Sequence, residues 1–211
     1  TFVIGRGGRV LWIGNPHDDR FEKIVDLAIA NKYDPILTPK GFEALEAAKR
    51  AANLRNWREA YMHLDKGVEV DPPLFGWLIV ERYVMTLEQE KNEAEAKAYL
   101  RRMFPGIATD PYSLGIVVDA LCKDPRISTR DLDSAMVFAE QMKRASGAMQ
   151  APGLAAVALV HATRGELDQA VEVQTTAFLG APVDEKPEMK RRLDEYQRMK
   201  ARRDQAKLFS E

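Results

Sequence analysis

Hydrophobic positions along the chain follow two patterns, and the change comes near residue 35. Before it, two runs of β-branched and aromatic residues, Phe2 to Ile4 and Val10 to Ile13, flank Gly5-Arg6-Gly7-Gly8. Apolar runs around a glycine-rich turn predict a β-hairpin. Apolar residues at helical spacing then predict a helix, and they are Phe21, Ile24, Val25, Leu27 and Ala28. Two apolar strands alone do not make a stable sheet, so the hairpin needs another surface to pack on.

From residue 39 onward the apolar positions keep a helical period throughout. Segments rich in Ala, Leu, Glu, Lys and Arg alternate with short breaks that contain Pro, Asp, Asn or Gly. The pattern predicts nine helices, at residues 39–53, 56–69, 73–88, 91–104, 110–122, 130–145, 150–164, 166–179 and 185–208. Short connections between so many helices indicate either an irregular α-helical bundle or a helical solenoid.

Two stretches repeat the same spacing of small residues. Both reach a proline in steps of 12, 7 and 5 residues: Ala48, Ala60, Gly67 and Pro72 in the first, Ala158, Ala170, Ala177 and Pro182 in the second. Small residues let the two helices of a hairpin cross closely, and a proline ends the second helix. This arrangement resembles the tetratricopeptide repeat, a helix–turn–helix unit of 34 residues. Gly165 stands at that family's inter-helix turn.

Four units of this kind fit the helical region. Ala94 lies 34 residues after Ala60 and places a second unit, while Ala135 lies 35 residues before Ala170 and places a third. The excess length falls in the loop from Lys123 to Thr129. The last segment, 185–208, is amphipathic and is predicted to cap the array. We therefore expect a mainly α-helical protein: about four tetratricopeptide-like hairpins and a capping helix in residues 36–211, after a β-hairpin and helix in residues 1–35.

The resemblance also implies a binding surface. The first helices of such units line a concave face that holds extended peptides, and the alternative is that these side chains pack against neighbouring parts of the chain. The residues expected on this face are Phe42, Leu45, Lys49, Asn53, Ile79, Tyr83, Leu87, Leu159 and Thr163. A partner protein or peptide is the implied ligand.

The opening of the chain is similar to the C-terminal end of a thioredoxin-like domain. Redoxins of the thiol-disulfide oxidoreductase group carry segments much like TFVIGRGGRVLWIGNP before a final helix, which would match Asp18 to Asn31. The resemblance implies that the chain is a fragment of a bacterial protein that acts outside the cytoplasm, in the periplasm. The family's Cys-x-x-Cys motif is absent from these residues, so its catalytic role passes to none of them.

Composition and charge exclude several other classes of function. The net charge of −1 gives no reason to expect a nucleic-acid partner, and no run approaches the roughly 18 apolar residues of a membrane span. Cys122 lies in an apolar stretch and is expected to be a buried small hydrophobe. The histidines at 17, 63 and 161 share no metal-ligand spacing, and His161 is expected to pack within its hairpin. We expect no catalytic residue, no cofactor and no metal, and thus no enzyme activity in this chain.

Two functions from different classes remain. The first is a non-catalytic tetratricopeptide-like scaffold at the C-terminal end of a thiol-disulfide oxidoreductase. The second is a stand-alone helical-repeat binding or assembly protein whose hairpin is native. In either case the hairpin either pairs with a second copy, burying Val3, Leu11 and Ile13, or folds back on the first helices with Trp12 as its anchor.

Overall fold

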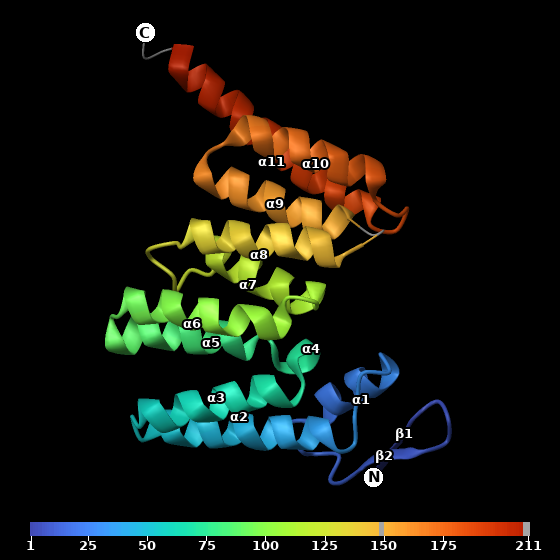
Figure 1. Ribbon diagram of the computed structural model, residues 1–211. Coiled ribbons are helices and arrows are strands. Elements are labelled where there is room, and N and C mark those ends of the chain that lie inside the picture. Colours follow the sequence, from blue (N-terminus) through green and yellow to red (C-terminus); the bar gives the residue numbers. More distant parts are fainter. Residues whose placement is uncertain (148–149, 209–211) are drawn as a thin grey trace. The chain divides into compact units, whose positions relative to one another are not determined.

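The protein is mainly α-helical (Figure 1), as the sequence predicts. A computed structural model describes residues 1–147 and 150–208, without the side chains of residues 207 and 208. These residues form eleven α-helices, one π-helical turn and a two-stranded antiparallel sheet. The chain divides into two compact units, Thr1–Leu78 and Ile79–Glu211, each with its own internal packing.

Unit 1 begins with the predicted β-hairpin. Strand β1 (Phe2–Ile4) pairs with β2 (Val10–Ile13), and the partners are Phe2 with Ile13, Val3 with Trp12 and Ile4 with Val10. The register shifts between Val3 and Ile4. This bulge leaves one extra residue in β2, Leu11. The neighbouring side chains of Leu11 and Trp12 can therefore lie on the same face of the hairpin.

One face of the hairpin is covered by helix α1 (Phe21–Ile29). Val3, Leu11 and Trp12 pack against a buried cluster of Ile24, Leu27 and Tyr33, and the Trp12 ring lies 5.6 Å from that of Phe21. The hairpin therefore folds back on the following helix with Trp12 among its anchors. Val3 and Leu11, which one of the two sequence-based alternatives places in a contact between copies, lie instead on this covered face.

Helices α2 (Leu37–Asn53) and α3 (Trp57–Val70) form the first helical hairpin, and α4 (Pro72–Phe75) follows. Glycine permits the closest contacts around this hairpin. A Cβ atom on Gly41 would lie 2.1 Å from the Phe75 ring, and one on Gly67 would lie 2.6 Å from Leu78. The small residues Ala48 of α2 and Ala60 of α3 are also buried.

Unit 2 continues the helical series. After α5 (Leu78–Met85) and the π-helical turn η1 (Thr86–Glu90) come α6 (Glu93–Ile107), α7 (Pro111–Lys123), α8 (Leu132–Ala145), α9 (Ala151–Arg164), α10 (Leu167–Gly180) and α11 (Lys186–Leu208). The sequence predicts one helix at 73–88, but Gly76 and Trp77 separate α4 from α5, and the chain widens to a π-turn at residue 86. Helix α6 also passes Pro105 and ends at Ile107, three residues beyond its predicted end.

The second helix of each helical hairpin begins in the same way. A capping residue is followed four positions later by an alanine with no exposed surface, whose N–H donates to the carbonyl of that capping residue. The pairs are Asn56 with Ala60, Asn92 with Ala96, Asp131 with Ala135, and Glu166 with Ala170.

This shared start corrects the predicted register at one position. Ala94 is exposed, and Ala96 takes the buried place that the repeat spacing predicts for Ala94. Ala135, Ala158, Ala170 and Ala177 are all fully buried. Gly165 lies in the α9–α10 turn with φ of +79°, a left-handed conformation that glycine adopts without strain.

Candidate protein-binding groove

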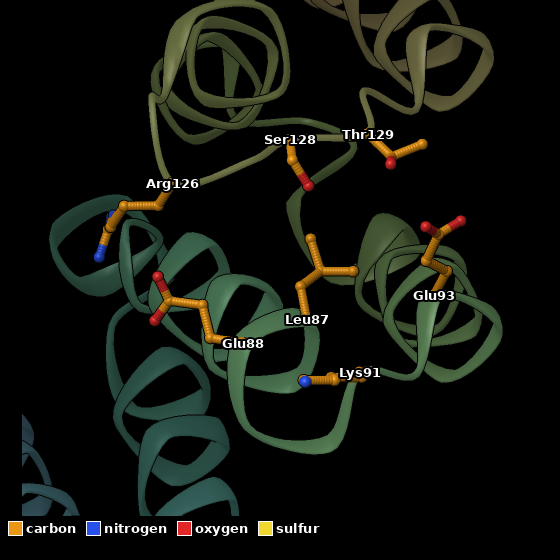
Figure 2. Close-up of a pocket in the computed structure, with 7 residues that line it drawn as sticks. All are labelled: Leu87, Glu88, Lys91, Glu93, Arg126, Ser128 and Thr129. Atoms are coloured by element: carbon orange, nitrogen blue, oxygen red, sulfur yellow. The ribbon is translucent and has the colours of Figure 1, made fainter.

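The described residues of unit 2 form a polar hollow and a smaller apolar groove. The polar hollow has a volume of about 360 Å³ and is lined by Leu87, Glu88, Lys91, Glu93, Arg126, Ser128 and Thr129. Figure 2 shows Leu87 pointing toward Ser128 of the long α7–α8 loop, with Glu88 and Glu93 on either side. The π-turn η1 and the left-handed Lys91 (φ +50°) bring these side chains to the mouth of the hollow.

Arg126 fixes the loop that forms one wall of this hollow. Its Nη1 and Nη2 donate to the Glu81 carboxylate at 3.0 and 2.9 Å, and Nη2 also donates to Asp124 at 2.8 Å. Ile127, within the loop, is buried, and Arg130 donates from Nη1 to the carbonyl of Leu121. Because the guanidinium of Arg126 is engaged by two carboxylates, it serves the loop's structure and is not available as a free anion-binding group.

The second hollow is an apolar groove between three helices. It has a volume of about 180 Å³, and its walls come mainly from α7, α9 and α11. The lining residues are Gly115, Val118, Asp119, Met142, Pro152, Ala155, Ala156, Leu159, Met189 and Arg192. Helices α7 and α9 open successive hairpins and α11 is the capping helix, so the groove runs along the first-helix side of the last two hairpins.

Small residues and methionines give this groove its shape. A Cβ atom on Gly115 would lie 3.2 Å from Cε of Met142, so the methionine tip rests against the glycine. Ala155 and Ala156 form part of the wall from α9, and Met189 comes from α11. Methionine is unbranched and polarisable and adapts to irregular apolar ligands. The wall of the groove is therefore apolar and adaptable.

Charged groups border the same groove, and each has a partner on its own helix. Asp119 pairs with Lys123, and Arg192 donates from Nε to Glu188 at 2.8 Å. Arg191 and Arg192 together lower the pKa of Glu188 to about 2. Burial raises the pKa of the Tyr196 hydroxyl to about 12, so this side chain is neutral at physiological pH. Asp119 and Arg192 thus supply one acidic and one basic group to an otherwise apolar surface.

The residues predicted for the concave face do not all lie at an open surface. In unit 2, Leu159 borders the groove, Leu87 borders the polar hollow, Thr163 bonds back to the Leu159 carbonyl, and Ile79 and Tyr83 are buried. In unit 1, Phe42 and Leu45 are half-buried, while Lys49 and Asn53 are exposed on α2. The Phe42 ring contacts that of Phe75 edge to face, at 5.6 Å. Of the predicted set, the groove contains Leu159 alone.

Most of the groove lining was missed by sequence reasoning. Gly115 lies in the middle of α7, where a glycine weakens a helix, and that cost is a signal that the position needs a close contact. The sequence around Met142 and Arg192 gives no comparable signal. Their positions in the groove lining depend on how α8 and α11 pack on the other helices.

The described residues contain no set of side chains arranged for metal binding, because no three His, Cys, Asp or Glu residues among them gather at one point. Cys122 is buried, and this burial raises the pKa of its thiol. His161 lies beside Glu166, with Nδ1 and Oε2 2.6 Å apart, in the α9–α10 turn. Among the described helices, none has the length and apolar character that crossing a membrane requires.

Comparisons with protein-family models, with curated proteins and with solved structures find no match to this chain. The functional argument therefore depends on the geometry of the groove and on the residues that line it.

Proposed function

We propose that this chain is a non-catalytic helical-repeat scaffold of the tetratricopeptide type, and that it binds an extended segment of a partner protein along the α7–α9–α11 groove. The observation that carries the proposal is the groove itself. It is lined by small and methionine side chains that come from neighbouring helices of unit 2. The bound segment would place one large apolar side chain between Met142 and Met189.

The polar border of the groove suits a peptide backbone. Asp119 is an acceptor for a peptide N–H, and Arg192 is a donor for a peptide carbonyl. Both side chains already have an ion-pair partner on their own helix, Lys123 for Asp119 and Glu188 for Arg192. An extended apolar peptide with few charges fits these features better than a highly charged one.

A peptide-display library tests this proposal. Peptides selected on the 211-residue protein would be measured by fluorescence anisotropy against the wild-type chain and against Ala156→Gln, which extends a side chain into the groove. Thr176→Gln, an exposed position on α10 outside the groove, is the matched control. We expect Ala156→Gln to weaken binding at least tenfold and Thr176→Gln to change it less than twofold. Selected peptides that bind all three proteins equally would contradict the groove assignment.

We also propose that residues 1–35 are the C-terminal end of a thioredoxin-like domain in a bacterial thiol-disulfide oxidoreductase, whose helical repeats position a protein partner. In support, both strands are apolar on both faces, which is typical of a sheet covered on two sides, and α1 covers one of them. The alternative is a stand-alone repeat protein with a native hairpin. The intact mass of the protein from its natural source separates these two proposals.

A further inference from the structure

Two small residues and one sulfur atom shape the wall of the α7–α9–α11 groove. Gly115 and Ala156 present only a Cα and a methyl group, so their part of the wall is flat. Sδ of Met142 lies 3.4 Å from the position that a Cβ atom on Gly115 would take, so this sulfur borders the same wall. The sulfur of Met189 is instead held by Nε2 of Gln174, at 3.6 Å. Met142 is therefore the methionine whose sulfur is placed to contact a ligand.

A flat wall beside a thioether sulfur suits an aromatic ring better than a branched aliphatic side chain. Sulfur makes favourable contacts with the edges of aromatic rings, and a planar ring can lie flat on small residues. The groove volume of about 180 Å³ is also sufficient for one ring, because an apolar cavity of about 150 Å³ in another protein binds benzene. Phenylalanine is therefore the apolar side chain that these walls fit best.

The α11 side of the groove carries an excess of positive charge. Residues 186–198 of this helix include five basic and three acidic side chains. One carboxylate, that of Glu188, is shared by Arg191 and Arg192. Within the described part of the chain, Arg192 donates to Glu188 through Nε alone, so its two terminal nitrogens remain for a ligand.

The other charged side chains around the groove are balanced in pairs. Asp119 pairs with Lys123 on α7, and Lys143, beside Met142 on α8, pairs with Glu140. The lining residues that α9 contributes are all apolar. The uncompensated charge at the groove is therefore positive, and it lies on the α11 side, at Arg192.

We propose that the groove selects an extended segment in which a phenylalanine stands next to an acidic residue. The ring lies on the wall of small residues against the Met142 sulfur, and the carboxylate accepts hydrogen bonds from the terminal nitrogens of Arg192. A guanidinium binds a carboxylate through two parallel N–H bonds, and the N–H groups left over still serve a peptide carbonyl. This inference rests on the proposed binding of a partner segment in the groove, and it adds the chemical class of the side chains that are bound.

Four synthetic eight-residue peptides test the proposal, with Phe-Glu, Leu-Glu, Phe-Gln or Leu-Gln at the centre and the same small residues elsewhere. Each would be titrated into the 211-residue protein labelled with ¹³C at its methionine methyl groups. The signal of Met142, assigned by its loss in Met142→Leu, reports binding at the groove itself. We expect the Phe-Glu peptide to bind about fivefold or more tightly than Leu-Glu or Phe-Gln, because each of these two lacks one contact. Only the peptides with a ring should shift the Met142 signal by a ring current.

Two variants of α11 separate a contact with Arg192 from a general effect of charge. Arg192→Gln should abolish the preference for Glu over Gln in the peptide and keep the preference for Phe over Leu. Arg198→Gln is the matched control, since it removes one positive charge from an exposed position of the same helix outside the groove lining. It should leave both preferences unchanged. Circular dichroism shows whether each variant keeps its helices.

The outcomes distinguish this inference from the proposed function. Equal affinities for all four peptides, with the Met142 signal still shifted, would overturn the preference and leave the peptide groove in place. A preference for Glu that survives Arg192→Gln, or that Arg198→Gln removes as strongly, would overturn the assignment of the carboxylate to Arg192. A Met142 signal that neither these peptides nor those from the display library move would overturn both the proposed function and the preference.

Discussion

Arg203 of α11 donates a hydrogen bond from Nη2 to Oδ2 of Asp168 at 2.8 Å, although 35 residues separate them along the chain. Lys200 pairs with the other oxygen of the same carboxylate. Asp168 lies in the first turn of α10, where a negative charge also interacts well with the helix dipole. One carboxylate thus ties the later turns of the capping helix to the start of the preceding helix.

This contact predicts a loss of stability in acid. Lys200 and Arg203 lower the pKa of Asp168 to about 2, whereas the pKa of an aspartate in an unfolded chain is about 3.9. A lowered folded-state pKa means that the stabilisation is complete above about pH 4 and is lost as the pH falls toward 2. We expect the thermal unfolding midpoint of the wild-type protein to fall over this range. The midpoint of the Asp168→Asn variant should fall less steeply, because this variant has already lost the carboxylate charge. Identical slopes for the two proteins between pH 4 and 2 would show that the ion pairs contribute nothing.

The buried alanines predict where side chains cannot grow. Ala60→Leu, Ala96→Leu and Ala170→Leu should each lower the free energy of unfolding by about 1–3 kcal/mol, because each crossing has no room for the added atoms. Ala94→Leu is the matched control: it is exposed, and it should change stability by less than about 0.5 kcal/mol. Urea midpoints measure all four. A large loss of stability from Ala94→Leu with none from Ala96→Leu would instead support Ala94 as the packing residue, as the repeat spacing predicts.

Cys122 is expected to be chemically silent in the folded protein. It is 5% exposed, and burial raises the pKa of its thiol, so little thiolate is present to attack a disulfide. The 211-residue chain should show no insulin-reduction activity, and Ellman's reagent should label Cys122 rapidly only in urea. Cys122→Ser provides the blank for both assays. Insulin reduction that disappears in this variant would show that the thiol is reactive after all.

The helices were predictable from sequence to a large extent, because their ends carry local signals. Asn56, Asn92, Asp110 and Asp131 cap helices through their side chains, and each stands within two residues of a predicted start. The single helix expected at 73–88 failed because Gly76 permits a break that apolar periodicity does not reveal. The register of the second hairpin failed for a related reason: Ala94 and Ala96 are chemically identical, and only the capping position at Asn92 distinguishes them.

The hairpin was predictable, but its faces were not. A continuous run such as Val10 to Ile13 has no alternation of polar and apolar residues from which to assign sides. The bulge beside Val3 then places Leu11 and Trp12 together against α1, which strict alternation would forbid. The groove in unit 2 was hidden for a tertiary reason, since Gly115 and Met142 meet only when α7 and α8 pack together.

The order of contacts in unit 2 has a consequence for folding. Helices α7 to α11 contact chiefly the next helix in sequence or the next but one, so few of their contacts require distant parts of the chain to find each other. Chains of this kind fold rapidly and unfold by fraying from an end. Among the described residues, α11 makes most of its helix–helix contacts with α10, whereas α9 packs against both α8 and α10. The amide protons of α11 should therefore exchange with solvent earlier than those of α9.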